Sequence, residues 1–124
     1  MQPRVLIVDD DADLCAQLKW TLAQDFEIFM ARDRPSALAV FRQVHPPVVT
    51  LDLGLPPCLH GVEEGFRTLH DILRADAWAK VIIITGREEH QHALEAIGQG
   101  AYDFFRKPIQ LDELKVLLRR ALYV

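Results

Sequence analysis

Acidic side chains stand at the ends of two short apolar runs in the sequence. Asp9 and Asp10 follow Val5–Val8, and Asp52 follows Val48–Leu51. If both runs are parallel strands that lie side by side, their carboxyl ends meet at one edge of the sheet and bring the three carboxylates together. Unneutralised, these groups would repel one another, and at least one would be driven towards protonation. A hard divalent cation removes the repulsion, and Mg²⁺ suits best because it takes one or two carboxylates and leaves room for a phosphate oxygen.

Further polar residues strengthen this interpretation against a simpler one. Taken alone, the run of aspartates from Asp9 is explained equally well as a solvated turn in which Asp11 caps a helix. Asp52, however, ends a buried run, which is a poor place for an unpaired charge. Thr85 and Lys107 end two further predicted strands and supply the hydroxyl and the cation that a bound phosphoryl group requires. The combination therefore predicts a metal site that handles a phosphoryl group.

Short β-rich runs alternate with amphipathic helical patterns along the whole chain. The predicted strands are Val5–Val8, Phe26–Met30, Val48–Leu51, Val81–Ile84 and Tyr102–Phe105. Some are almost continuously aliphatic or β-branched, as expected of parallel strands buried on both faces. The apolar residues that recur at helical spacing are Leu14, Leu18 and Leu22; Ala37, Leu38, Phe41 and Val44; Phe66, Leu69, Ile72 and Leu73; Leu94 and Ile97; and Leu111, Leu114, Leu118 and Leu122. Five βα units in this order predict an α/β fold, a doubly wound parallel sheet with helices on both faces.

Helix-breaking residues agree with these boundaries. Pro46-Pro47 closes the second helical pattern, and Gly98 and Gly100 close the fourth. The stretch Gly54–Glu64 is irregular, because it is rich in Gly and Pro and long for a βα connection of about 2–6 residues. It borders the predicted metal site, where it could gate access or be an inert insertion.

The composition is that of an ordinary globular protein. The chain has 124 residues, 50% of them hydrophobic, and residues 1–124 are predicted to form one domain. A net charge of −4 argues against direct nucleic-acid binding, which needs a basic face. No apolar run approaches the ~20 residues of a membrane helix and no signal-peptide cleavage site follows the start, so a cytoplasmic location without membrane contact is predicted. Cys15 and Cys58 fit no metal or disulfide framework and are interpreted as buried or incidental thiols.

Four segments of the chain resemble the signature of two-component response-regulator receiver domains. They are Val8-Asp9-Asp10, Leu51-Asp52-Leu53-Gly54-Leu55-Pro56, Ile84-Thr85-Gly86 and Phe104-Phe105-Arg106-Lys107-Pro108. The match spans essentially the whole chain, and the combination is far more specific than any one segment. The resemblance implies a flavodoxin-like fold of five strands in the order 2-1-3-4-5 with five helices. The Pro-rich loop and the Gly-Ala-Tyr-Asp-Phe-Phe ending are similar to the receivers of enhancer-binding transcriptional regulators, and most of all to the subgroup associated with exopolysaccharide and exosortase gene clusters.

The same resemblance implies roles at the acidic site. Asp52 is expected to be the phosphoacceptor, which attacks the phosphohistidine of a partner sensor histidine kinase and becomes an acyl phosphate. Asp9, Asp10, Asp52 and the backbone carbonyl of Gly54 are expected to hold Mg²⁺, for which Mn²⁺ can substitute. Lys107 matches the lysine that contacts the phosphoryl group, so catalysis rests on positioning and electrostatics. The domain would catalyse only its own phosphorylation and dephosphorylation and is not an enzyme acting on an external substrate.

Thr85 and Phe104 match the hydroxyl and the aromatic ring that switch such domains after phosphorylation. The surface expected to change comprises the fourth helix, the fifth strand and the fifth helix, and it would act on a transcriptional output domain or another effector. Charges of opposite sign are predicted on its two helices: Glu88, Glu89 and Glu95 on one, and Lys115, Arg119 and Arg120 on the other. Solvated side chains explain these charges, and a phosphorylation-dependent homodimer could also use them.

Other residues carry weaker signals. His90 and His92 lie two apart at the start of the fourth helix and therefore point to different faces, so exposed helix residues are favoured over a metal site. Trp20 and Trp78 fall at helix ends and are interpreted as covers of the core.

Three other classes of protein compete with the receiver interpretation. A haloacid-dehalogenase-like hydrolase also forms an aspartyl phosphate, but it needs a second acid two residues after the nucleophile, where this chain has Gly54. A flavodoxin-like nucleotide-binding protein needs a Gly-rich loop after the first strand, and the sequence has none. A receiver-like module that no longer takes phosphate is disfavoured by the complete set of acids with Thr85 and Lys107.

Overall fold

Parallel strands form the central sheet of the molecule. The computed structural model describes residues 2–57, 61–86 and 90–123. In this part of the chain the strands are β1 (Arg4–Val8), β2 (Glu27–Ala31), β3 (Val48–Asp52), β4 (Lys80–Thr85) and β5 (Asp103–Arg106). Their order across the sheet is β2-β1-β3-β4-β5, and each neighbouring pair is parallel. The predicted doubly wound sheet and its strand order are confirmed.

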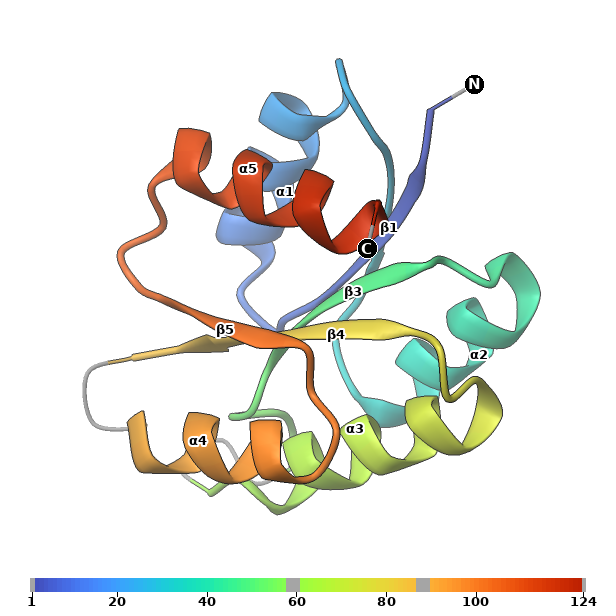
Figure 1. Ribbon diagram of the computed structural model, residues 1–124, viewed down its shortest axis with the longest axis vertical. Coiled ribbons are helices and arrows are strands. Elements are labelled where there is room, and N and C mark those ends of the chain that lie inside the picture. Colours follow the sequence, from blue (N-terminus) through green and yellow to red (C-terminus); the bar gives the residue numbers. More distant parts are fainter. Residues whose placement is uncertain (1, 58–60, 87–89, 124) are drawn as a thin grey trace.

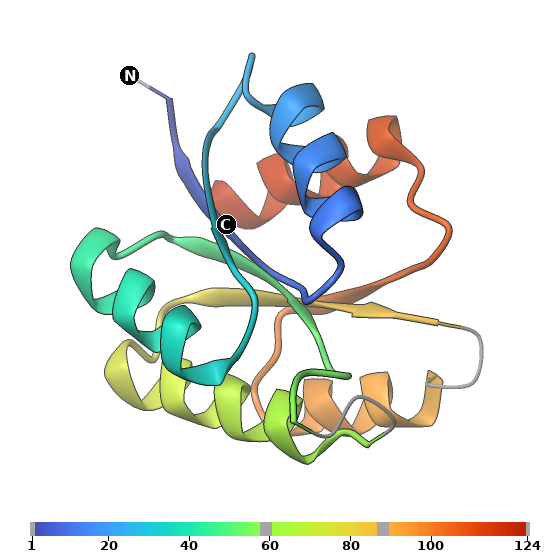
Figure 2. The same cartoon turned by 180° about the vertical axis from the view of Figure 1, so that it is seen from behind.

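Helices cover both faces of this sheet. They are α1 (Ala12–Leu22), α2 (Arg34–Val44), α3 (Glu63–Ala75), α4 (His90–Gly98) and α5 (Leu111–Leu122). Figure 1 shows α1 and α5 together on one face and α2, α3 and α4 on the other, and Figure 2 shows the same layers from behind. None of the described helices is both long and apolar enough to cross a membrane.

The alternation of side chains along the strands builds a separate core on each face. On β1, Leu6 and Val8 belong to the cluster beneath α2, α3 and α4, whereas Val5 and Ile7 belong to the cluster beneath α1 and α5. All four side chains are buried because helices cover both faces of the central strands. Burial on both faces holds the strand ends, and hence the residues that follow them, in fixed positions.

Local capping explains where several helices begin and end. Asp11 caps α1, since its side chain accepts hydrogen bonds from the backbone N–H groups of Asp13 and Leu14. Asp33 forms a capping box with Ser36 at the start of α2. That helix ends at Val44, and its C-cap His45, with a left-handed backbone (φ 51°), is followed by the predicted Pro-Pro break.

Three apolar side chains differ from the predicted core. Trp20 and Trp78 are 85% and 84% exposed, so the prediction that they cover the core is wrong. Leu94 is 53% exposed, although Ile97 of the same helix packs against the core as predicted. Periodicity identifies the inner face of a helix, but it does not say how far the neighbouring layer extends over that face.

Boundaries also differ by a residue at several strand ends. The strand predicted at Phe26–Met30 runs from Glu27 to Ala31, and the one predicted at Tyr102–Phe105 runs from Asp103 to Arg106. Phe26 is nevertheless buried, as a core residue just before β2. Of the residues discussed above, Cys58, Glu88 and Glu89 lie outside the described part of the chain.

Candidate functional site

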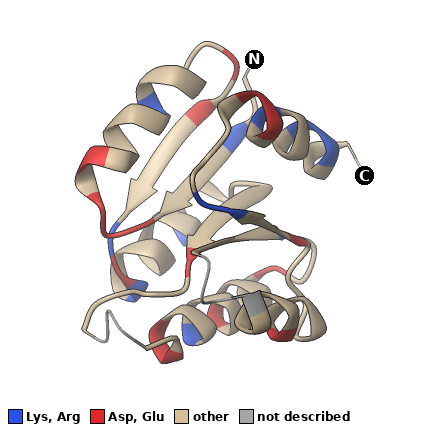
Figure 3. Cartoon of the chain, turned by 90° about the vertical axis from the view of Figure 1, so that its left-hand side faces the viewer, with Lys and Arg blue, Asp and Glu red and all other residues tan. Residues whose placement is uncertain are grey.

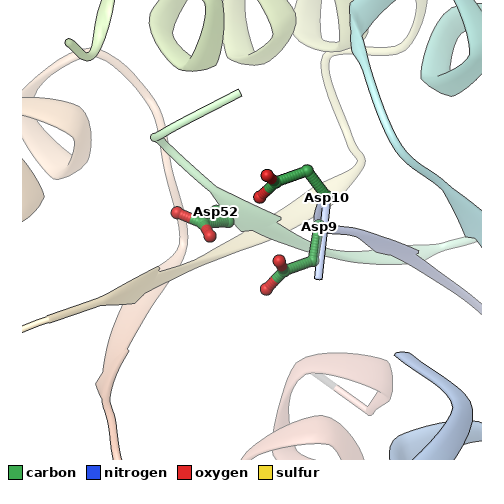
Figure 4. A group of neighbouring side chains, drawn as sticks. All are labelled: Asp9, Asp10 and Asp52. Carbon is green, nitrogen blue, oxygen red and sulfur yellow. The ribbon is translucent and has the colours of Figure 1, made fainter. Parts of the chain in front are cut away.

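The predicted acidic residues converge at the carboxyl edge of the sheet. Asp9 and Asp10 directly follow β1, and Asp52 ends β3, which is paired with β1 in the register Val8–Leu51. Each of the three offers a carboxylate oxygen, and these oxygens all lie within 4.8 Å of one another. Figure 4 shows the three carboxylates gathered beyond the strand ends. Asp9 is 3% exposed and Asp52 is 9% exposed, so two of the charges are almost fully removed from bulk water.

Backbone amides and one lysine orient the two buried carboxylates. Asp9 Oδ1 accepts a hydrogen bond from Asp11 N (2.9 Å), and Asp52 Oδ1 accepts one from Gly54 N (3.0 Å). The remaining oxygens face Lys107, whose Nζ lies 3.4 Å from Asp52 Oδ2 and 3.7 Å from Asp9 Oδ2. Lys107 thus lies at the cluster as predicted.

The residues that the structure describes compensate the negative charge of this cluster only in part. The pKa of Asp9 is raised from 3.8 to about 6, chiefly by burial and in addition by the charges of Asp52 and Asp10. The Asp11 backbone N–H and the charge of Lys107 act in the opposite direction but are outweighed. A site that drives a carboxyl towards protonation in this way is one that a divalent cation would stabilise.

This raised pKa predicts a pH dependence of the metal-free domain. The folded Asp9 carboxyl binds its proton up to a higher pH than the unfolded one, so the free energy of unfolding should fall as pH rises from about 4 to 6 and then level off. The loss is bounded by about 3 kcal/mol, because one pKa unit corresponds to roughly 1.4 kcal/mol. Urea unfolding with chelator at pH 4.5, 5.5 and 7 measures it, and Asp9→Asn should flatten the profile. A wild-type profile no steeper than that of Asp9→Asn would contradict the assignment.

Thr85 and Lys107 are brought together by the pairing of β4 and β5. Thr85 ends β4 opposite Arg106, and its carbonyl oxygen accepts a hydrogen bond from Lys107 N (2.7 Å). The Thr85 side chain is fully buried, and within the described residues its Oγ1 has no hydrogen-bond partner. A buried hydroxyl without a hydrogen-bond partner is uncommon in a folded protein and calls for an explanation.

The predicted switch aromatic lies two strand positions before Thr85 in the β4–β5 register. Phe104 on β5 stands opposite Ile83 of β4. Its ring is half-buried and packs against the cluster beneath α2, α3 and α4.

The basic residues of the predicted patch on α5 form ion pairs with acidic residues of the same chain. Lys115 and Arg119 form ion pairs with Asp25 (3.4 and 3.5 Å), and Arg120 pairs with Asp103 of β5 (2.6 Å). Figure 3 shows residues of both signs spread over the helices and not a single-sign face. The side chains in these pairs are between 23% and 58% exposed, so solvent screens the pairs and their contribution to stability is small.

Within the described part of the chain, the remaining candidates form no additional site. His92 lies 3.8 Å from Glu95 and edge-on to Phe66, and among the described residues the aspartate cluster is the one group with metal-ligating geometry. Burial raises the pKa of the Cys15 thiol to about 11, and Cys15 Sγ donates to the Asp9 carbonyl oxygen (3.5 Å). Cys15 is thus a free, buried thiol, in agreement with the predicted buried or incidental thiols.

Comparison with known proteins identifies the family. The family model of the response regulator receiver domain matches residues 5–119 of the sequence. The chain belongs to this family. It is 35% identical over 120 residues to the regulatory protein AtoC of Escherichia coli K12 and 31% identical over 123 residues to the DNA-binding response regulator MtrA of Mycolicibacterium paratuberculosis. The crystal structure of the receiver domain of NtrX from Brucella abortus matches with a TM-score of 0.85 and 33% identity, over 95% of this chain and 97% of that one.

These matches cover almost the whole of this chain but only part of each curated relative. The matches take in 96% of this chain but 25% of AtoC, and 98% of this chain but 52% of MtrA. The chain thus spans a quarter to a half of these relatives, whose remaining residues have no counterpart in it. It is a receiver domain of the two-component response-regulator kind, similar to the receivers of transcriptional regulators.

One contact around the site was not predictable from the motifs. Gly65 of α3 lies against the backbone of Leu53, the residue between Asp52 and Gly54. In the sequence, Gly65 directly follows the irregular stretch Gly54–Glu64, and nothing in its spacing indicates that it meets Leu53.

Proposed function

We propose that this receiver domain accepts a phosphoryl group on Asp52 while Asp9, Asp10, Asp52 and the Gly54 carbonyl hold Mg²⁺, with Mn²⁺ as a substitute. The observation that carries the proposal is the convergence of three carboxylates within 4.8 Å, with Lys107 Nζ 3.4 Å from Asp52. The donors are hard oxygen atoms, as Mg²⁺ prefers, and their charge exceeds that of the lysine beside them. The residues present therefore fit the ion.

The geometry of Asp52 supports a role as nucleophile. The Gly54 N–H occupies Oδ1, which leaves Oδ2 to attack phosphorus. A bond forms between Asp52 Oδ2 and phosphorus as the bond from phosphorus to the histidine nitrogen of the donor breaks, and the electron pair leaves with that nitrogen. Lys107 exchanges its contact with Oδ2 for one with a phosphoryl oxygen. When bound, Mg²⁺ supplies charge neutralisation for the carboxylates and the phosphoryl oxygens.

We propose that Thr85 and Phe104 carry the signal away from this site. A phosphoryl oxygen on Asp52 gives the orphaned Thr85 hydroxyl an acceptor. Movement of Thr85 towards it vacates space that the half-buried Phe104 ring fills, and phosphorylation biases an equilibrium between the two states. The surface that changes is formed by α4, β5 and α5, where we place the contact with an output domain or effector and a phosphorylation-dependent homodimer.

The wider assignment follows the same reasoning. Residues 1–124 act as one signalling unit in the cytoplasm, with a sensor histidine kinase as phosphoryl donor and no direct contact with nucleic acid. The domain catalyses only its own phosphorylation and dephosphorylation. Its output is transcriptional control of the enhancer-binding kind, supported by the similarity to AtoC and to the NtrX receiver.

Labelling by a small phosphodonor tests this function directly. We expect acetyl phosphate to add one phosphoryl group to the domain in the presence of Mg²⁺ or Mn²⁺, and none when a chelator is present. Intact-mass spectrometry reads the label, and Ca²⁺ serves as the control cation because it favours more ligands at longer distances. Labelling of equal rate and extent in the chelator would rule out the metal-dependent mechanism.

Metal binding should also stabilise the fold. Mg²⁺ relieves the repulsion among Asp9, Asp10 and Asp52, so at a hundred times its dissociation constant it should raise the free energy of unfolding by about 2.7 kcal/mol. Thermal melts at pH 7.5 with and without Mg²⁺ measure the effect, with Asp10→Ala as the comparison. The proposed ligand set fails if both proteins respond equally.

A further inference from the structure

Helix α3 touches the loop of the acidic site without any side chain between them. Gly65 is buried in the first turn of α3. A Cβ at this position would lie 2.4 Å from both Cα and O of Leu53 and 2.8 Å from its carbonyl carbon. No side chain, not even a methyl group, fits into this contact without moving backbone atoms. The helix therefore rests directly on the peptide between Asp52 and Gly54.

That peptide belongs to the turn which shapes the acidic site. Gly54 N donates to Asp52 Oδ1 (3.0 Å), and Leu55 N donates to Leu53 O (3.1 Å). Leu53 O is also one of the atoms that a Cβ on Gly65 would meet. Displacement of this carbonyl would move the peptides on both sides of Gly54, and with them the hydrogen bond that orients Asp52 and the carbonyl of the metal-ligand set.

Arg34, at the start of α2, forms ion pairs with two acidic residues of α3, one of them in the first turn. Arg34 lies 3.3 Å from Glu64 and 3.2 Å from Asp71, both on α3. The Glu64 side chain is 12% exposed and directly precedes Gly65. Arg34 itself follows the Asp33 capping box, so its backbone is fixed at the same edge of the sheet. Ion pairs that are partly shielded from water hold geometry better than exposed ones.

We propose that Gly65 is a positioning residue for the acidic site. Its missing side chain lets α3 set the Leu53–Gly54 turn, and the Arg34–Glu64 pair keeps the helix in register with that turn. The inference rests on the proposed Mg²⁺ function for its effect on metal affinity, but its effect on the Gly54 N–H is independent of that function.

Gly65→Ala and Gly98→Ala form a matched pair for the test. Both replace a glycine of a helix, but an added Cβ on Gly98 meets nothing within 4 Å. We expect Gly65→Ala to weaken Mg²⁺ binding about 10- to 100-fold, as loss of outer support of metal ligands typically does, with Gly98→Ala unchanged. Isothermal titration gives the affinities. NMR of the metal-free protein follows the Gly54 amide. In Gly65→Ala alone, this amide should exchange its hydrogen faster and change its chemical shift.

Each outcome decides the inference. A folded Gly65→Ala protein with wild-type Mg²⁺ affinity and a wild-type Gly54 amide overturns it. If Gly65→Ala does not fold, the Mg²⁺ affinity and the Gly54 amide are measured in Arg34→Gln instead. An unchanged Gly54 amide in that variant also overturns the inference. If wild-type protein binds no Mg²⁺, the proposed function fails, while the metal-free Gly54 amide still decides the positioning role.

Discussion

Asp52→Asn is expected to abolish phosphoryl labelling by acetyl phosphate at every Mg²⁺ concentration. The amide is nearly the same size as the carboxylate and can keep the hydrogen bond from Gly54 N to Oδ1, so the fold and the turn should persist. What is lost is the anionic oxygen beside Lys107, and with it the nucleophile. Because the attacking oxygen itself is removed, the loss of labelling should be complete and not partial. Intact-mass spectrometry over an extended time course measures it.

The same variant should lose labelling but gain stability in the absence of metal. The charge of Asp52 helps to raise the pKa of Asp9, so its removal should lower that pKa and raise the free energy of unfolding at pH 7. Asp13→Asn, an exposed acid in the first turn of α1, is the control and should change neither labelling nor stability strongly. Label that appears on Asp52→Asn at the wild-type rate would place the phosphoacceptor elsewhere.

The arrangement of the acidic site was predictable because it depends on strand ends. Aliphatic runs specify strands that are buried on both faces, and a parallel sheet then fixes which ends share an edge. Asp9, Asp10 and Asp52 follow two such runs, so their approach needs only the pairing of β1 with β3. Lys107 and Thr85 depend on the pairing of β4 with β5, which is equally regular. The resemblance to the family supplied the strand order that periodicity alone does not give.

Contacts made between layers were not predictable in this way. The approach of Gly65 to Leu53 depends on where α3 lies over the sheet, and the pairing of Arg34 with Glu64 depends on how α2 and α3 lie side by side. Neither is encoded in the spacing of residues along one element. The exposed indoles of Trp20 and Trp78 show the same limit, because hydrophobicity favours burial but cannot create a neighbouring layer to cover the ring.

Thr85→Val should separate the stability of the domain from its switching. The substitution replaces a fully buried hydroxyl that has no hydrogen-bond partner among the described residues with a methyl group of similar size. A buried unpaired polar group costs about 1–3 kcal/mol, so the variant should be more stable than wild type by about 1 kcal/mol in the absence of phosphate. Most core substitutions have the opposite sign. Urea unfolding of the unphosphorylated proteins measures this difference.

The same variant should lose the response to phosphorylation while it keeps the phosphorylation itself. Asp52 and Lys107 are untouched, so acetyl phosphate should still label the protein. Without the hydroxyl, however, nothing draws residue 85 towards the phosphoryl oxygens, and the Phe104 ring has no vacated space to enter. Beryllofluoride should therefore shift the NMR signals around Phe104 and promote self-association in wild type, and do neither in Thr85→Val.

Thr68→Val provides the matched control, because Thr68 is equally buried but donates its hydroxyl to the Glu64 carbonyl oxygen (2.7 Å). Thr68→Val removes this hydrogen bond and leaves the Glu64 carbonyl oxygen with one partner fewer, so the variant should be less stable than wild type by about 1 kcal/mol. It lies on α3, away from the β4–β5 pair, and should leave the beryllofluoride response intact. If Thr85→Val is instead destabilised as much as Thr68→Val, its hydroxyl is satisfied in the resting protein and is not waiting for an acceptor. If it is stabilised yet still shifts Phe104 with beryllofluoride, the signal leaves Asp52 by a route that does not need this hydroxyl.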